Sequence, residues 1–348
     1  MHYAPQNIIE TKIHLLIGRL RLASPGAYPI RRPMSLRVLV PWPQLFEALR
    51  LPGIEPILWQ LDDEHSIIPE ADVLITERPT NLAHRAHVRQ IKDLKHVHLL
   101  SIGYEWILEH LPANVGLSNS RGAVEDATAE HCVALILAAT RELPTAIKQQ
   151  NNSQWQRLWT GSLHGSNVLI LGAGGVGSEI ISRLKPFKPS KITTVARSAR
   201  TTDEGQRIHG LDELDVHLPL ADIVIIALPH TPDTEGMIEK KFLSLMHNGA
   251  LLVNIGRGAL VDTEALLHEL ELGRLRAALD VTYPEPLPVD HRLWQAPSCL
   301  ITPHMGGDTT EFLRLATNQA VQQVLRILEG QQPLNLVLDR HPDLTPTT

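Results

Sequence analysis

Two kinds of segment, which differ in their pattern of apolar and polar positions, alternate along this chain. Short runs rich in Val, Ile and Leu recur, and longer stretches with apolar residues at helical spacing separate them. Short apolar runs bounded by turn residues are typical of strands buried on both faces, and their alternation with helices indicates parallel sheets. The pattern predicts an α/β protein built from doubly wound parallel sheets.

The apolar runs fall into two groups. The first predicts strands at 36–41, 72–76, 97–102 and 115–119, and the second at 167–172, 191–196, 222–228, 250–255, 276–281 and 299–303. Helices are predicted at 123–142, 176–185, 263–272 and 309–329. A single core stops growing near ~250–300 residues, so 348 residues suggest two domains. We therefore expect two Rossmann-like or flavodoxin-like domains with a cleft between them.

The boundaries follow from the order of the runs. We expect residues 1–33, which show no apolar periodicity, to be a disordered extension. The segment 34–122 would form the first domain, and 123–305 a Rossmann-like second domain. The helix at 309–329 and the strand-like "LNLV" tail would return to the first domain and make it discontinuous, as 34–122 plus 306–340.

Bulk composition narrows the functional class. A net charge of −6 argues against a nucleic-acid partner. The longest apolar run, "CVALILAA", falls far short of the ~20 residues of a membrane span, so no membrane partner is expected. The cysteines, Cys132 and Cys299, both lie in apolar contexts, which indicates buried free thiols in a reducing compartment and a cytoplasmic location.

A glycine-rich turn lies between a predicted strand and a predicted helix. In "NVLILGAGGVGSEI", Gly172, Gly174 and Gly177 have the G-x-G-x-x-G spacing. The first glycine makes a tight turn, the second admits a pyrophosphate, and the third lets helix and strand pack closely. In this context the motif indicates a dinucleotide, with an S-adenosylmethionine enzyme as the main alternative.

The next strand end bears on cofactor choice. An NAD site has an acidic residue about 20 positions further on, where it binds the ribose 2′-hydroxyl. Here the strand ends in Ala196, Arg197 and Ser198, and no carboxylate follows until Asp203. A small residue followed by arginine leaves room for a 2′-phosphate and supplies a charged partner. We expect NADP, as NADPH, to be preferred, with NAD possible; a solvated basic loop is the alternative.

Further candidate residues stand at the ends of three later strands. Arg257 lies between glycines in "NIGRG", where it could grip a carboxylate. Asp280 and Glu285 lie in the proline-rich "LDVTYPEPLP", and His304 lies in "TPHMGG". Each has a plain alternative when read alone: a surface arginine, a solvated loop glutamate or a loop histidine.

The four motifs in this order closely resemble the D-isomer-specific 2-hydroxyacid dehydrogenase family, in particular its glyoxylate and hydroxypyruvate reductases. The resemblance covers residues 95–310 well and residues 34–94 weakly. It implies that His304 is the general acid that protonates the substrate carbonyl oxygen. It also implies that Glu285 orients the imidazole and that Arg257 binds the carboxylate of a 2-oxo acid.

The resemblance also assigns binding residues. Asp280 would contact the nicotinamide carboxamide, the loop "LLSIGYEW" would bind the substrate carboxylate through its amides, and "LPHTPDTEG" would lie on the cofactor side. The expected cofactor contacts are Gly172, Gly174, Val176, Gly177, Arg197, Ser198, Pro229, Thr234, Ile255, Gly256, Asp280 and Gly306. The expected substrate contacts are Ile102, Gly103, Arg257 and His304.

Departures from the family pattern concern substrate choice. Tyr104, Glu105 and Trp106 replace the Val-Asp-His type of sequence that family members usually carry, so these residues and the nearby Arg78 leave substrate size and charge open. Glu285 argues against the formate dehydrogenases of the superfamily, which have glutamine there.

We thus expect an NAD(P)-dependent oxidoreductase that reduces small 2-oxo acids to 2-hydroxy acids. A dinucleotide-sensing regulatory protein with negligible turnover is the alternative. The resemblance implies a homodimer. No metal site is expected, because the closely spaced pairs His84/His87 and His96/His98 lack cysteine or carboxylate partners at zinc-like spacing.

Overall fold

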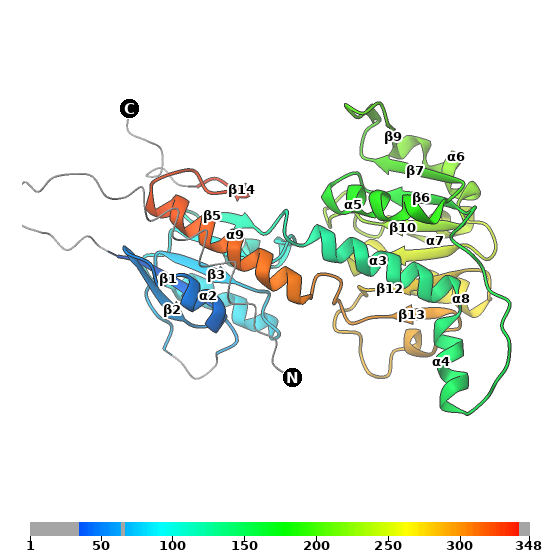
Figure 1. The fold of residues 1–348 in the computed structure, drawn as a ribbon, viewed down its shortest axis with the longest axis horizontal. Helices are drawn as coiled ribbons and strands as arrows, with labels where there is room; N and C mark the ends of the chain where they lie inside the picture. The colour runs from blue at the N-terminus through cyan, green and yellow to red at the C-terminus, as the bar shows by residue number, and fades with distance from the viewer. Residues whose placement is uncertain (1–34, 64–66, 341–348) are drawn as a thin grey trace, which may run out of the picture. The chain divides into compact units, whose positions relative to one another are not determined.

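The computed structural model describes residues 35–63 and 67–340, so the predicted extension at 1–33 lies outside the described residues. The described chain forms two sheets dominated by parallel strands, with helices packed against them (Figure 1). No helix of the described residues is long and apolar enough to cross a membrane. The predicted α/β class is confirmed.

The first sheet has the strand order β14-β5-β4-β3-β1-β2. All of its neighbours pair in parallel except β14, which runs antiparallel to β5. Its strands are β1 (Leu36–Val40), β2 (Ile54–Leu58), β3 (Val73–Thr76), β4 (His96–Leu99), β5 (Gly116–Asn119) and β14 (Leu336–Leu338). The tail strand thus completes a sheet that otherwise comes from residues 36–119.

Strand β2 was not predicted, and its sequence explains why. Pro56 interrupts the apolar pattern of "IEPIL" and removes a backbone donor, which argues against a central strand. The structure places β2 at the sheet edge, where β1 is its partner. A proline is tolerated there because an edge strand has a side that needs no sheet partner.

The second sheet has the order β13-β12-β11-β10-β6-β7-β9-β8, parallel throughout except for the pair β8 and β9. Its strands are β6 (Asn167–Leu171), β7 (Lys191–Ala196), β8 (Arg200–Thr201), β9 (Arg207–Gly210), β10 (Ile223–Ile226), β11 (Leu251–Asn254), β12 (Arg276–Leu279) and β13 (Cys299–Ile301). The six strands expected here are confirmed to within a few residues, whereas the short, polar β8 and β9 were not predicted.

The strand order defines where a ligand binds in such a sheet. Strands β6 and β10 are neighbours, and the connection after β6 leads to β7 whereas the connection after β10 leads to β11, so the two leave in opposite directions along the sheet. In doubly wound folds, ligands bind beyond the carboxyl ends of strands at such a switch point. The glycine-rich turn begins directly after β6, at this point of the sheet.

The helices are α2 (Pro43–Ala48), α3 (Glu125–Thr140), α4 (Leu143–Asn151), α5 (Gly175–Leu184), α6 (Leu214–His217), α7 (Lys240–Leu245), α8 (Thr263–Glu271) and α9 (Thr310–Leu328). Helix α3 buries Cys132 and Ile136 in a core with residues of β6, β10 and β11. Helix α9 buries Phe312 and Val324 in a core with residues of β1 and β3. Each sheet is therefore covered by a helix that contributes to its own core.

Candidate active site

The candidate residues of the second sheet lie at the carboxyl ends of its strands. Gly172 follows β6, Arg257 follows β11, Asp280 follows β12 and His304 follows β13. Strands β11, β12 and β13 are adjacent and parallel, so their carboxyl ends meet at one edge. Segments that are separate in sequence are brought together at this edge.

His304 and Glu285 form a direct pair. Nδ1 of His304 lies 2.6 Å from Oε1 of Glu285, and Nη1 of Arg78 donates to the same oxygen at 2.9 Å. Burial alone would raise the pKa of the Glu285 carboxyl. The hydrogen bond and charge of His304, with the charge of Arg78, outweigh burial and lower that pKa. Glu285 is therefore held as a carboxylate beside the imidazole, whose Nε2 is left for another partner.

The turn that carries His304 is organised by Asp280. The backbone N–H groups of Met305 and Gly306 donate to the two carboxylate oxygens at 3.0 and 2.9 Å, and the Thr302 hydroxyl donates to Oδ1 at 2.6 Å. His131 Nε2 lies 3.2 Å from the same oxygen. Burial opposes ionisation of Asp280, but these donors lower its pKa to about 2. Asp280 thus fixes the His304 turn, a role that sequence reasoning missed; the expected nicotinamide contact remains a prediction.

Gly306 of this turn is needed for its lack of a side chain, not for a positive φ. His304 itself adopts the left-handed conformation with φ of 51°, while Gly306 does not need a positive φ. A Cβ on Gly306 would lie 2.9 Å from Oδ2 of Asp280. Gly306 is therefore required for close approach to the carboxylate that binds its own N–H.

Arg257 lies against the predicted substrate loop. A Cβ on Gly103 would lie 1.7 Å from Nη2 of Arg257, so the guanidinium lies over the Gly103 backbone. The same nitrogen is 3.8 Å from Oε2 of Glu105, and Nη1 donates to the Gly256 carbonyl at 2.7 Å. The structure therefore brings Arg257 together with the loop that contains Ile102 and Gly103.

The glycines on both sides of Arg257 are needed for tight packing. A Cβ on Gly256 would lie 2.7 Å from the Leu228 carbonyl oxygen, and one on Gly258 would lie 1.8 Å from that of Thr282. Ile255, which precedes this turn, is buried. The "NIGRG" turn is thus wedged between two neighbouring strand ends, which fixes the backbone of Arg257.

The aromatic residues of the predicted substrate loop pack against the protein core. Tyr104 and Trp106 pack against a core cluster of the first sheet that includes Ile107 and Leu111. Their size therefore fills the base of the loop. Glu105 begins the 3-10 helix Glu105–His110 and faces Arg257, so its charge is the departure that reaches the candidate site.

The glycine-rich turn matches the three roles expected of it. Gly172 has φ of +123°, and a Cβ there would lie 2.4 Å from the Ala227 carbonyl oxygen. A Cβ on Gly177 would lie 2.1 Å from the Gly172 carbonyl oxygen, whereas a Cβ on Gly174 would have no atom of the described residues within 4 Å. The first and third positions are closed by backbone, and the second is open in front of helix α5, with Val176 in its first turn. This arrangement fits a pyrophosphate at the helix N-terminus.

One acidic residue beside this turn escaped the sequence analysis. Glu125 begins α3 and accepts hydrogen bonds from the N–H groups of Gly122 and Val124 at 2.7 and 3.3 Å. A Cβ on Gly175 would lie 3.0 Å from its Oε1. The carboxylate thus caps the start of α3 and packs against the start of α5, but nothing in its local sequence predicts that contact.

The remaining cofactor candidates lie on two loops. Arg197 and Ser198 follow β7 and are exposed, while Ala196 is buried at the strand end. The buried Thr234 donates its hydroxyl to the Pro229 carbonyl at 2.8 Å and accepts from the Thr231 N–H. The structure therefore shows Thr234 holding the loop in shape, and a cofactor contact by this residue remains a prediction.

The histidine pairs considered in the sequence have structural partners. His96 and His98 both contact the Ser118 hydroxyl, at 2.8 and 2.9 Å, and burial lowers the pKa of His98 to about 4. The rings of His84 and His87 stack with centroids 5.1 Å apart. His96 and His98 are thus held within the first sheet, whereas His84 and His87 lie in the 3-10 helix Leu82–Gln90.

Two doubly wound sheets with an open glycine turn at a strand switch point define a nucleotide-binding α/β protein. Residues 133–306 match the family model described as "D-isomer specific 2-hydroxyacid dehydrogenase, NAD binding domain". The chain belongs to the D-isomer-specific 2-hydroxyacid dehydrogenase family, and it is therefore a nicotinamide-dependent oxidoreductase of 2-hydroxy acids.

Individual relatives agree with this assignment. The glyoxylate reductase/hydroxypyruvate reductase of Mus musculus is 33% identical over 247 residues, which cover 69% of this chain and 75% of the relative. The structure of a D-isomer-specific 2-hydroxyacid dehydrogenase family protein from Aeromonas salmonicida has a TM-score of 0.78, with 27% identity over 88% of this chain and 99% of its own. A dehydrogenase of this type from Xanthobacter autotrophicus Py2, solved with NADPH and MES, has a TM-score of 0.73 and 26% identity over 88% of this chain and 98% of its own.

Proposed function

We propose that this protein reduces small 2-oxo acids of the glyoxylate and hydroxypyruvate type with NADPH. The observation that carries the proposal is the 2.6 Å contact between His304 and Glu285 at the strand edge that also presents Arg257. The identity to the mouse reductase supports the substrate class. The open Gly174 and the exposed N-terminus of α5 fit a dinucleotide.

The proposed roles follow from the contacts. Arg257 binds the substrate carboxylate together with the N–H groups near Ile102 and Gly103, because its guanidinium already lies over that loop. Glu285 occupies Nδ1 of His304, so Nε2 carries the proton that passes to the carbonyl oxygen. The bound nicotinamide supplies the hydride. Arg78 helps to keep Glu285 ionised beside the imidazole.

We propose NADPH rather than NADH as the preferred cofactor. Strand β7 ends in Ala196, which brings no negative charge to the ribose, and the exposed Arg197 and Ser198 follow it as candidate phosphate partners. The NADPH complex of the Xanthobacter relative supports the compatibility of this fold with that cofactor. We assign residues 34–122 plus 306–340 to the substrate domain and 123–305 to the cofactor domain.

We further propose a cytoplasmic homodimer. The thiols Cys132 and Cys299 are free, which is consistent with a reducing compartment. Helix α4 and the segment after it expose Leu143, Ile147, Trp155 and Trp159, the last two at 100% and 96%. Apolar side chains gathered on one segment are typical of an interface, and a second copy of the chain is the occupant we propose.

The test is oxidation of NADPH and of NADH by the purified protein with a panel of 2-oxo acids, including glyoxylate, hydroxypyruvate and bulkier analogues. The proposal expects saturable turnover with the small members of the panel. A dinucleotide sensor on the same fold would bind the cofactor without oxidising it for any member. That result would reject the reductase and leave the alternative.

A further inference from the structure

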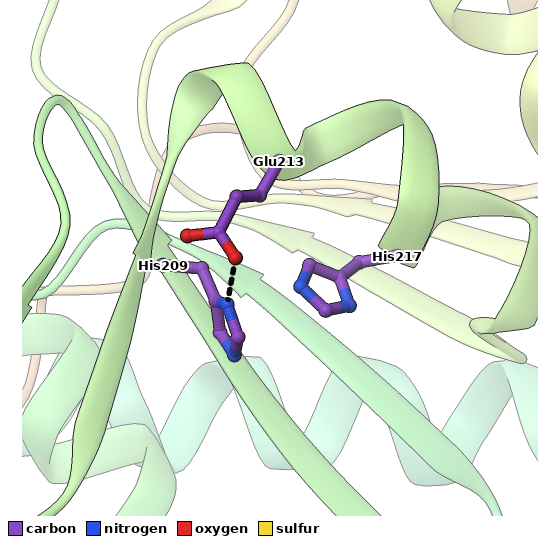
Figure 2. A group of neighbouring side chains, drawn as sticks. All are labelled: His209, Glu213 and His217. Carbon is purple, nitrogen blue, oxygen red and sulfur yellow. Dashed lines mark hydrogen bonds and ion pairs between the residues drawn. The ribbon is translucent and has the colours of Figure 1, made fainter.

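His209, Glu213 and His217 converge outside the candidate active site. His209 lies on β9, Glu213 ends the 3-10 turn Leu211–Glu213, and His217 ends α6. Each offers one donor atom, and these atoms all lie within 4.8 Å of one another. Figure 2 shows the two imidazoles and the carboxylate turned toward a common point.

The contacts inside this trio leave one donor unused. Nδ1 of His209 lies 2.8 Å from Oε2 of Glu213, and the rings of His209 and His217 lie 4.2 Å apart between centroids. Nε2 of His217 is buried and has no hydrogen-bond partner among the described residues. A buried nitrogen without a partner is costly, and it indicates a missing ligand at that position.

We propose that His209, Glu213 and His217 bind a divalent transition metal, with Zn²⁺ as the best match, and that water completes the coordination. Two imidazoles and one carboxylate are donors that Zn²⁺ favours, at about 2.0–2.2 Å from each atom. Ca²⁺ and Mg²⁺ require oxygen ligands and fit poorly. Donor atoms within 4.8 Å of one another need only small side-chain rotations to surround one such ion.

Arg207 is the competitor for this site. Its Nη2 lies 3.2 and 3.1 Å from the two carboxylate oxygens of Glu213, and its side chain is 65% exposed. The guanidinium neutralises Glu213 in the structure, and a bound cation would replace it there. An exposed arginine can move away at low cost, because such surface pairs are worth little. Removing Arg207 should therefore strengthen metal binding.

The position of the site suggests what a bound metal would stabilise. His209 is paired with Val195 across the sheet, and Gly210 with Ala196. A bound metal would cross-link strand β9 and helix α6 beside the end of β7. The site is therefore structural and lies next to the segment that carries Arg197. It shares no residue with the His304–Glu285 pair.

The test is titration of the chelator-treated full chain with Zn²⁺ by calorimetry, and with Co²⁺ by visible absorption, which reports the coordination geometry. We expect one ion per chain at this site and an increase in melting temperature with Zn²⁺. His217→Gln should weaken binding by more than the ~10–100-fold typical of losing an outer-shell partner. Arg207→Met should tighten it, and His87→Gln, in the stacked pair of the 3-10 helix Leu82–Gln90, should leave it unchanged.

Two results would overturn the proposal. One is the absence of saturable Zn²⁺ binding by both the wild-type chain and Arg207→Met. The other is binding that both His209→Gln and His217→Gln leave undiminished, since another group would then hold the ion. Arg207→Met keeps all three ligands, so its gain in affinity tests the site even if a histidine variant fails to fold.

Discussion

Arg78 donates to the same Glu285 oxygen that pairs with His304, at 2.9 Å. The sequence associated Arg78 with the charge of the substrate, but the structure shows it bound to the glutamate. The two residues are 207 positions apart. The arginine and the imidazole thus share one carboxylate oxygen, and this sharing links the segment after β3 of the first sheet to the His304–Glu285 pair.

We predict that Arg78→Met moves the acidic limb of the kcat/KM profile to higher pH. The charge of Arg78 is one cause of the lowered pKa of Glu285, so its removal lets the carboxyl protonate at higher pH. A partly exposed pair is worth ~0.2–1 kcal/mol, which corresponds to roughly 0.1–0.7 pH unit. Arg78→Lys, which keeps the charge, should shift the limb less. Identical profiles for all three proteins would show that Arg78 does not act on Glu285.

The same pair contributes to folding stability with a definite sign. A carboxyl whose pKa is lower in the folded state stabilises the protein above its unfolded pKa, and this contribution is lost as pH falls through the folded value. Unfolding of wild type and Glu285→Gln in urea should therefore differ most near neutral pH and converge in acid. A difference that persists below the folded pKa of Glu285 would assign the loss of stability to packing.

Cofactor choice should depend on the end of β7. NADPH should exceed NADH in kcat/KM by at least about ten-fold, because a charge-assisted hydrogen bond is worth ~1.5–3 kcal/mol. Ala196→Asp combined with Arg197→Leu should reverse this order, mainly through a higher KM for NADPH. Ser198→Ala should also lower the preference for NADPH over NADH, but by less. Equal use of both cofactors by the wild type would contradict the role given to Arg197 and leave the oxidoreductase assignment intact.

The exposed tryptophans after α4 should govern oligomeric state. We predict that light scattering gives the wild type twice the mass of one chain. The double variant Trp155→Glu with Trp159→Glu should be monomeric, because the dimer interface would bury two unpaired carboxylates, which is costly. The matched control is Ile67→Glu, at an exposed apolar residue between β2 and β3, and this variant should stay dimeric. A monomeric wild type would exclude the dimer. A dimeric double variant would place its interface elsewhere.

The parts of the structure that the sequence predicted are those with local signals. The glycine turn after β6 and the buried strands have characteristic spacing, and both lie where expected. Asp280 shows the limit, because its partners Met305 and Gly306 follow the next strand. The sequence marks it as a strand-end acid but does not show which donors surround it.

Long-range contacts explain the rest of what was missed. Arg78 and Glu285 meet only because two sheets form, and no periodicity encodes that meeting. Similarly, His209, Glu213 and His217 are spaced at intervals of four residues. They form a cluster only because β9 and α6 lie side by side in the fold, which their spacing alone does not predict. The pairs of histidines that are closer in sequence pack with Ser118 or with each other instead.

The most direct test of the central claim compares wild type with His304→Ala on the best 2-oxo acid of the panel. His304 is proposed to donate the proton, so its removal should lower kcat by about 10²–10⁴-fold. The dissociation constant of NADPH, measured by fluorescence, should stay close to that of the wild type. A variant that retains wild-type kcat would contradict the account, because the proton would then come from another group.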